Sequence, residues 1–456
     1  MHVSDSKDIP STGRGRLGPW LVVLASLLVA VAAVSSAFSA STPIATSNPP
    51  KTLSETAPTI GNPPPTAVAA TPTPVAVQEP GPPKLDTVPV RLETTPVPLP
   101  GGKGGIGLDD LLFARGLKKV VVPGGRSGNL DLIDPETRVI VPVSGFSEKN
   151  ESGVEKGHAG QKEHGIKAGR DNQKERADQK DRGGNPGADG RRERGDERES
   201  AGGRGEGINS VDEVRDLLFV TDRTELRLDV VDPATRTIVA QTRLAGGPDY
   251  VRFVKPTGEV WVTQPGEERI EIFTLPAKGK QIPSHDGFIN VPGGPESLVI
   301  DESHHRAYTH TWKGSTAAID LGRREIVATW SNGCEGSRGI ALDPVHGFLF
   351  VGCAEGRAVA LDPARDGAIV GKLDHGSGVD IIAFNPVLRH LYLPGGKSKT
   401  MAILGVAESG GLSLLGTVKT AEGSHCVVAD DRSQAWVCDP GHGRLLLVHD
   451  TLPAVK

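Results

Sequence analysis

Residues 218–222 read LFVTD, and six other segments of the chain carry a similar short apolar phrase. The last six phrases begin 42 to 47 residues apart, whereas 98 residues separate the first two. A period of this length indicates that each phrase belongs to one repeated structural unit. The phrases are VVVPG from Val120, LFVTD from Leu218, VWVTQ from Val260, AYTHT from Ala307, LFVGC from Leu349, LYLPG from Leu391 and AWVCD from Ala435.

A second landmark repeats with the same period. Residues 130–137 (LDLIDPET) and 228–235 (LDVVDPAT) each contain Asp-Pro, which is typical of a tight turn. Each unit has four runs with strand character: one after a Gly-rich turn, the repeated phrase, one ending at the Asp-Pro turn, and a β-branched run. Four strands in a unit of this length are typical of a β-propeller blade. We therefore predict an all-β, seven-bladed β-propeller with four-stranded blades.

The two ends of the repeat region predict how the ring closes. The last unit stops soon after Asp450, which leaves no room for its fourth strand. Residues 88–99 (VPVRLETTPVPL) have strand character but belong to no unit. We predict that this N-terminal segment supplies the missing outer strand. Its prolines are compatible with that place, because an edge strand tolerates residues that cannot donate a backbone hydrogen bond.

Two segments have the composition of disordered chain. Residues 41–86 are rich in Pro, Thr, Ala and Ser and predict an extended linker or stalk. Residues 148–207 interleave fourteen acidic with fourteen basic residues and contain no aromatic residue, which predicts a disordered charged insertion. We therefore expect the closing strand and first blade at 87–147 and the other six blades at 208–456.

Residues 1–40 have the pattern of a targeting segment. Arg14 and Arg16 precede an apolar run at 20–34, and small residues follow it. This run suits the core of a cleaved signal peptide, whereas an extended run at 17–38 is long enough for a membrane anchor. Both alternatives place the rest of the chain outside the cytoplasm, in the periplasm or at the cell surface.

Charge and cysteine content narrow the function classes. The formal net charge of −5 gives no electrostatic argument for a nucleic-acid partner. An even number of cysteines in an exported chain favours disulfides, and no CxxC or haem-attachment motif is present. We predict two bridges within blades, Cys334–Cys353 and Cys426–Cys438, because each pair would face across neighbouring antiparallel strands.

The candidate site lies where the inner strands of a propeller meet the mouth of the central channel. The carboxylates there could hold a divalent cation, Arg338 could bind an anionic group, and His425 could act as an acid or base. No other cofactor motif and no catalytic assignment emerge, and Asp109 aligns less well as a sixth member. Aligning the Gly-rich turns gives the same position in five consecutive units to Asp249, Glu296, Arg338, Asp380 and His425.

The phrases LFVTD and VWVTQ, together with Gly-Gly-Pro turns at 246–248 and 293–295, resemble the YVTN-repeat, lactonase-like seven-bladed propellers of bacteria. The resemblance covers about residues 88–456 without the insertion. It implies the fold and an exported or surface location, and related rings include lactonases and lyases. The shared motifs are structural, so no catalytic residue of those enzymes is carried over.

Two functions follow as hypotheses. The first is an exported, membrane-tethered and monomeric propeller that acts as a binding or scaffold module for a protein or cell-envelope ligand. The alternative is a hydrolase or lyase of the lactonase-like kind in the channel, with or without a divalent metal. Convergence within coordination distance of any three among Asp249, Glu296, Asp380 and His425 would favour the enzyme.

Overall fold

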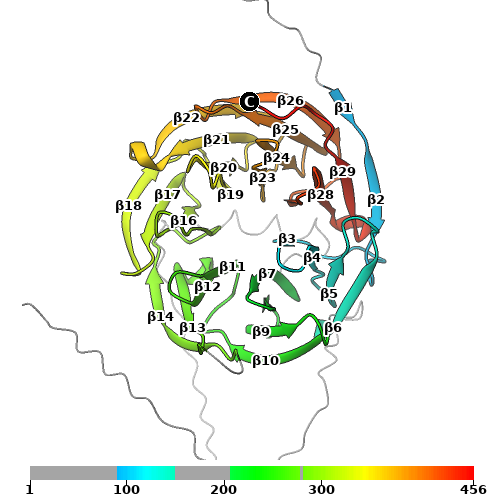
Figure 1. Ribbon diagram of the computed structural model, residues 1–456, viewed down its shortest axis with the longest axis vertical. Coiled ribbons are helices and arrows are strands. Elements are labelled where there is room, and N and C mark those ends of the chain that lie inside the picture. Colours follow the sequence, from blue (N-terminus) through cyan, green and yellow to red (C-terminus); the bar gives the residue numbers. More distant parts are fainter. Residues whose placement is uncertain (1–89, 149–205, 278–280) are drawn as a thin grey trace, which may run out of the picture. The chain divides into compact units, whose positions relative to one another are not determined.

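The structure, a computed structural model, describes residues 90–148, 206–277 and 281–456. These residues form seven β-sheets arranged as blades around a central axis (Figure 1). The predicted targeting segment, the Pro-rich linker and nearly all of the charged insertion lie outside the described residues. Within the described ranges, no helix is long and apolar enough to cross a membrane.

The blades follow one another along the chain. The first contains β3 (Leu112–Ala114), β4 (Lys119–Pro123), β5 (Ser127–Ile133) and β6 (Ile140–Glu148). The second contains β7 (Ile208–Val214), β8 (Leu217–Asp222), β9 (Arg227–Asp232) and β10 (Thr237–Arg243). The third contains β11 (Val251–Val254), β12 (Glu259–Gln264), β13 (Arg269–Thr274) and β14 (Ser284–Asn290). The fourth contains β15 (Val299–Asp301), β16 (Arg306–Thr311), β17 (Ser315–Asp320) and β18 (Glu325–Ser331).

The remaining blades repeat this pattern. The fifth contains β19 (Ser337–Leu342), β20 (Leu349–Cys353), β21 (Arg357–Asp362) and β22 (Ala368–Asp374). The sixth contains β23 (Ala383–Asn385), β24 (His390–Gly395), β25 (Thr400–Val406) and β26 (Leu412–Lys419). The seventh contains β27 (Val427–Ala429), β28 (Gln434–Asp439) and β29 (Arg444–His449). Three short 3-10 helices, η1 (Pro265–Glu267), η2 (Pro363–Arg365) and η3 (Pro440–His442), lie in turns.

Each blade places its strands in chain order from the axis outward, and neighbours pair antiparallel. The repeated phrase forms the buried second strand, as in β8. The fourth strand alternates exposed and half-buried residues, as in β10, because only one of its faces packs on a neighbouring blade. The predicted seven-bladed propeller with four-stranded blades is confirmed.

The N-terminal segment closes the ring as predicted, and it also pairs with a second blade, which the sequence did not indicate. Strand β2 (Thr94–Pro98) pairs antiparallel with β29 and completes the seventh blade. Strand β1 (Val90–Leu92) instead adds a parallel fifth strand to β26 of the sixth blade. The predicted closing strand is therefore divided between two adjacent blades, with Glu93 between its halves.

Both predicted disulfides are present. The Cα atoms lie 5.3 Å apart in Cys334–Cys353 and 5.4 Å apart in Cys426–Cys438. Each bridge joins the segment before an inner strand to the second strand of the same blade, and both therefore lie toward the end of the ring where inner strands begin. Closing loops of this size stabilises a fold by about 3 kcal/mol per bridge.

Candidate functional site

The aligned residues lie where the inner strands begin. Asp249 precedes β11, Glu296 precedes β15 and Asp380 precedes β23, while Arg338 is the second residue of β19. The backbone N–H groups of Asp249 and Glu296 donate to carbonyls of the second strand in their own blades, at 2.8 and 2.9 Å. These bonds fix the start of each inner strand, and we call this end of the central axis the mouth.

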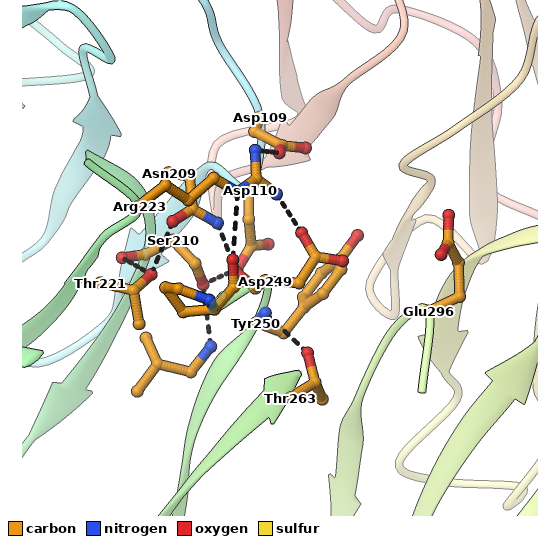
Figure 2. Close-up of polar contacts among 12 residues, drawn as sticks. Asp109, Asp110, Asn209, Ser210, Thr221, Arg223, Asp249, Tyr250, Thr263 and Glu296 are labelled. Atoms are coloured by element: carbon orange, nitrogen blue, oxygen red, sulfur yellow. Dashed lines mark hydrogen bonds and ion pairs between the residues drawn. The ribbon is translucent and has the colours of Figure 1, made fainter. Parts of the chain in front are cut away.

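An arginine from the second blade connects the acids of its two neighbours at the mouth (Figure 2). Arg223 follows the LFVTD phrase, and its guanidinium pairs with Asp109 at 2.9 Å and with Asp249. Its Nε also donates to the carbonyl of Pro248 at 3.1 Å. Asp109, whose alignment was poor in the sequence, therefore belongs to the mouth.

The fourth and fifth blades contribute a second ion pair. Arg338 Nη1 donates to Glu296 Oε1 at 2.5 Å, and the indole N–H of Trp312 donates to the other oxygen of the same carboxylate. Across both ion-pair groups, the side chains are 15–32% exposed, so they are recessed but reach solvent. Figure 2 shows Glu296 set apart from the Arg223 group.

Asp380 of the sixth blade differs from the other mouth acids. It is half-buried, and its carboxylate has no hydrogen-bond or ion-pair partner among the described residues. Its charge nevertheless raises the pKa of both Asp249 and Glu296. Asp249, Glu296 and Asp380 therefore lie in one electrostatic field, although they come from three different blades.

Burial is the main cause of the raised pKa values of two acids at the mouth. Burial raises the pKa of Asp249 well above its ordinary value, Arg223 opposes this shift, and Asp109, Glu296 and Asp380 add to it. The pKa of Glu296 is also raised, first by burial, while Arg338 lowers it. Raised carboxyl pKa values are common where a protein binds a ligand or performs proton transfer.

His425 has different surroundings. Its side chain is buried, and Nδ1 lies 2.6 Å from the carbonyl oxygen of Gly423 and 3.7 Å from Sγ of Cys438. The structure therefore places His425 against the Cys426–Cys438 disulfide. Its backbone carbonyl accepts from Ile381 N at 2.9 Å, which joins the sixth and seventh blades.

A second group of charged side chains joins the inner strand of the third blade to the first blade. Arg252 on β11 donates to both oxygens of Asp110 in the first blade, at 2.6 and 3.0 Å. Its Nε donates to the carbonyl of Leu298 in the fourth blade at 3.1 Å. Ser210 of the second blade donates to Asp110 at 2.5 Å. Arg252 thus reaches from the third blade past the second and forms a floor beneath the mouth.

The aligned turns gave no residue from the second blade, whose inner strand β7 carries Asp212 and Glu213. Asp212 lies deeper, accepts from Phe253 N at 2.6 Å, and has its pKa raised to about 6, mainly by burial. Glu213 accepts from two backbone N–H groups of a turn in the first blade, at 2.9 and 3.0 Å. Arg223, which the sequence analysis missed, represents the second blade instead. The turn after each second strand reaches the mouth. The residue that follows each repeated phrase was therefore the sequence signal that could have identified Arg223.

The mouth acids do not form a ready-made metal site. Among the described residues, two groups bring three ligand atoms within 4.8 Å of one another, and both consist largely of the disulfide cysteines. The groups are His425 with Cys426 and Cys438, and Glu355 with Cys334 and Cys353. The carboxylates of Asp249, Glu296 and Asp380 are not gathered in this way. Their spacing suits a ligand larger than a single ion.

Comparisons with known proteins support the fold alone. No family model and no curated protein matches the chain. A chain in the crystal structure of the mitotic checkpoint complex is similar, with TM-score 0.57 and 13% identity over 82% of this chain and 98% of that chain. The Cps50 (Swd1) β-propeller domain of Myceliophteria thermophila has TM-score 0.53 and 12% identity over 76% and 98%. Kuenenia stuttgartiensis hydrazine synthase has TM-score 0.53 and 11% identity over 76% and 96%.

Proposed function

We propose that this protein is an exported binding module that holds a polar ligand at the mouth of its propeller. One observation carries the proposal: charged side chains from the first six blades gather at one end of the ring and stay partly exposed. Burying a charge is costly, and a fold that only needed stability could fill this end with apolar side chains. The ligand is a protein or a component of the cell envelope.

Other features agree with an exported platform. The N-terminal pattern favours secretion or membrane anchoring, and two disulfides suit an oxidising compartment. The resemblance to YVTN-repeat propellers points to the same location. Ion pairs that cross blades hold the mouth in one arrangement before the ligand arrives, which lowers the cost of binding. One similar chain comes from the crystal structure of a protein complex, which agrees with a binding role.

A hydrolase or lyase at the mouth is the second candidate. The observation in its favour is the raised pKa of Asp249 and Glu296, since a carboxyl group that keeps its proton to higher pH is better suited to act as a general acid. The spacing of the acids gives less support to a metal-dependent hydrolase or lyase. Hydrolysis of lactone and ester panels, compared between the protein and Glu296→Gln, tests this candidate directly.

Capture from cell-envelope extract tests the binding module. The mouth variant combines Asp249→Asn, Glu296→Gln and Asp380→Asn. Its matched control is Glu408→Gln, which removes an exposed charge from the hairpin between β25 and β26 of the sixth blade. We expect a partner retained by the protein and by the control but lost from the mouth variant. Retention of the same partners by all three proteins would contradict the proposal.

A further inference from the structure

The balance of charge at the mouth indicates the sign of the ligand. Two arginines stand among four acids, and Arg223 and Arg338 are both engaged in ion pairs with those acids. Asp380 has no described partner. An additional positive group would reduce the repulsion among Asp249, Glu296 and Asp380, whereas an anion would have to displace existing pairs.

The side chain of Tyr250 points to the same place. Tyr250 is 6% exposed, and its phenol oxygen has no hydrogen-bond partner among the described residues. Burial and the charges of Asp110 and Asp249 raise its pKa, so the hydroxyl stays neutral. Figure 2 shows its ring beside Asp249, directed toward the side on which Glu296 lies. A buried phenol usually finds a partner, so a ligand N–H group is a natural donor to this oxygen.

We propose that the mouth binds an organic cation, the ammonium or guanidinium group of a lysine or arginine side chain on a partner protein. The inference rests on the proposed function and names the chemistry of its ligand. Such a group is larger than a metal ion and can donate to Asp380, Glu296 and the Tyr250 hydroxyl even though these acids do not converge on one point.

The floor beneath the mouth favours a side chain over a threaded strand. Arg252 reaches Asp110 and the carbonyl of Leu298, and its own guanidinium lies 5.0 Å from the ring centre of Tyr250. These contacts join the first, third and fourth blades beneath the mouth. A slender cationic side chain can therefore enter from the mouth and end at Tyr250.

Binding should depend on pH in a direction that the acids determine. Asp249 and Glu296 hold protons to higher pH than ordinary carboxyl groups do. A cation binds better to their ionised forms, so binding releases protons and strengthens as pH rises through their titration range. A neutral ligand would show no such trend.

Titration of the full-length protein with small probes tests the inference. The probes are Nα-acetyl-lysine N-methylamide, the arginine analogue, and the neutral Nε-acetylated lysine analogue, followed by NMR or calorimetry. We expect both cationic probes to bind at least about tenfold more tightly than the neutral one, since a charge-assisted bond contributes that much. Asp380→Asn should weaken them by about tenfold or more, Tyr250→Phe less, and Glu408→Gln not at all. Circular dichroism confirms that each variant is folded.

Several outcomes would overturn the inference. Equally tight binding of the neutral probe would rule out a cationic ligand. Unchanged binding of the cationic probes to Asp380→Asn would rule it out as well. Tighter binding of glucosamine than of the lysine probe would assign the amine to an envelope sugar, and competition by micromolar Ca²⁺ would assign the site to a metal. Failure of every probe, with capture of an envelope partner still lost in the mouth variant, would refute the cation and leave the binding module standing.

Discussion

Asp131 offers a test of how the first and last blades meet. It lies on β5, is fully buried, and neither of its carboxylate oxygens has a hydrogen-bond partner among the described residues. Alternate residues of a strand share a face, and Ile133 packs in a core cluster with Val97 and Leu445 of the last blade. Asp131 therefore faces an apolar seam. Burial raises its pKa from 3.8 to about 7.

The size of the effect follows from these two values. They differ by about 3, and each unit of pKa corresponds to about 1.4 kcal/mol, so ionisation of Asp131 costs the fold about 4 kcal/mol. Between pH 3.8 and about 7 the folded state holds this proton more tightly than the unfolded state does. The stability contributed by the protonated form is therefore complete below pH 3.8 and is lost as pH rises to about 7.

The substitution Asp131→Asn keeps the shape of the protonated acid and cannot ionise. We expect little difference in the free energy of unfolding at pH 4, and at pH 8 the variant should be more stable by about 4 kcal/mol. Denaturant titrations of both proteins from pH 4 to 8 measure this difference. The contributions of the other buried acids cancel because both proteins contain them. A difference that does not change with pH would refute the reasoning.

Asp134, three residues along the same chain segment, provides a control of opposite sign. A hydrogen bond from Lys119 at 2.7 Å lowers its pKa below the ordinary value. Its stabilising contribution is present above the unfolded pKa and is lost as pH falls through the folded one. Asp134→Asn should therefore destabilise the protein at neutral pH and have less effect in acid.

Three further predictions concern stability. Removing residues 1–99 deletes the closing strands and should destabilise the fold by several kcal/mol, about what burying two aliphatic side chains contributes, whereas removing 1–86 should not; equal melting temperatures would contradict this. Asp450→Asn should cost about 2 kcal/mol, because the amide has one acceptor oxygen where Asp450 uses two, toward His390 and Tyr392 at 2.7 Å and toward Leu452 N at 3.1 Å; a cost below about 1 kcal/mol in urea titration would refute it. Replacing Cys426 and Cys438 by serine should cost about 3 kcal/mol, and an unchanged urea midpoint would argue against this bridge.

The fold could be predicted because each blade repeats the same local sequence pattern. The buried second strand and the Asp-Pro turn recur with one period, so seven copies could be aligned without any tertiary information. The missing last strand made the role of Thr94–Pro98 predictable. The parallel pairing of Val90–Leu92 with β26 was not, since adding a strand to a sheet edge leaves no periodic signal.

The candidate site was predictable only in part. Asp249, Glu296 and Asp380 occupy equivalent places before the inner strands, and alignment of the turns was enough to bring them to one end. Arg223 comes from a different turn and Arg252 contacts residues of the first and fourth blades, so their roles depend on long side chains that cross between blades. Sequence spacing contains no information on such contacts.

We propose that the mouth of this propeller binds a ligand through its charged side chains. The most direct measurement is capture from envelope extract by the protein, by the variant with Asp249→Asn, Glu296→Gln and Asp380→Asn, and by Glu408→Gln, quantified by mass spectrometry. We expect a partner that is depleted at least about tenfold on the mouth variant alone. A partner profile that is the same for all three proteins would contradict it.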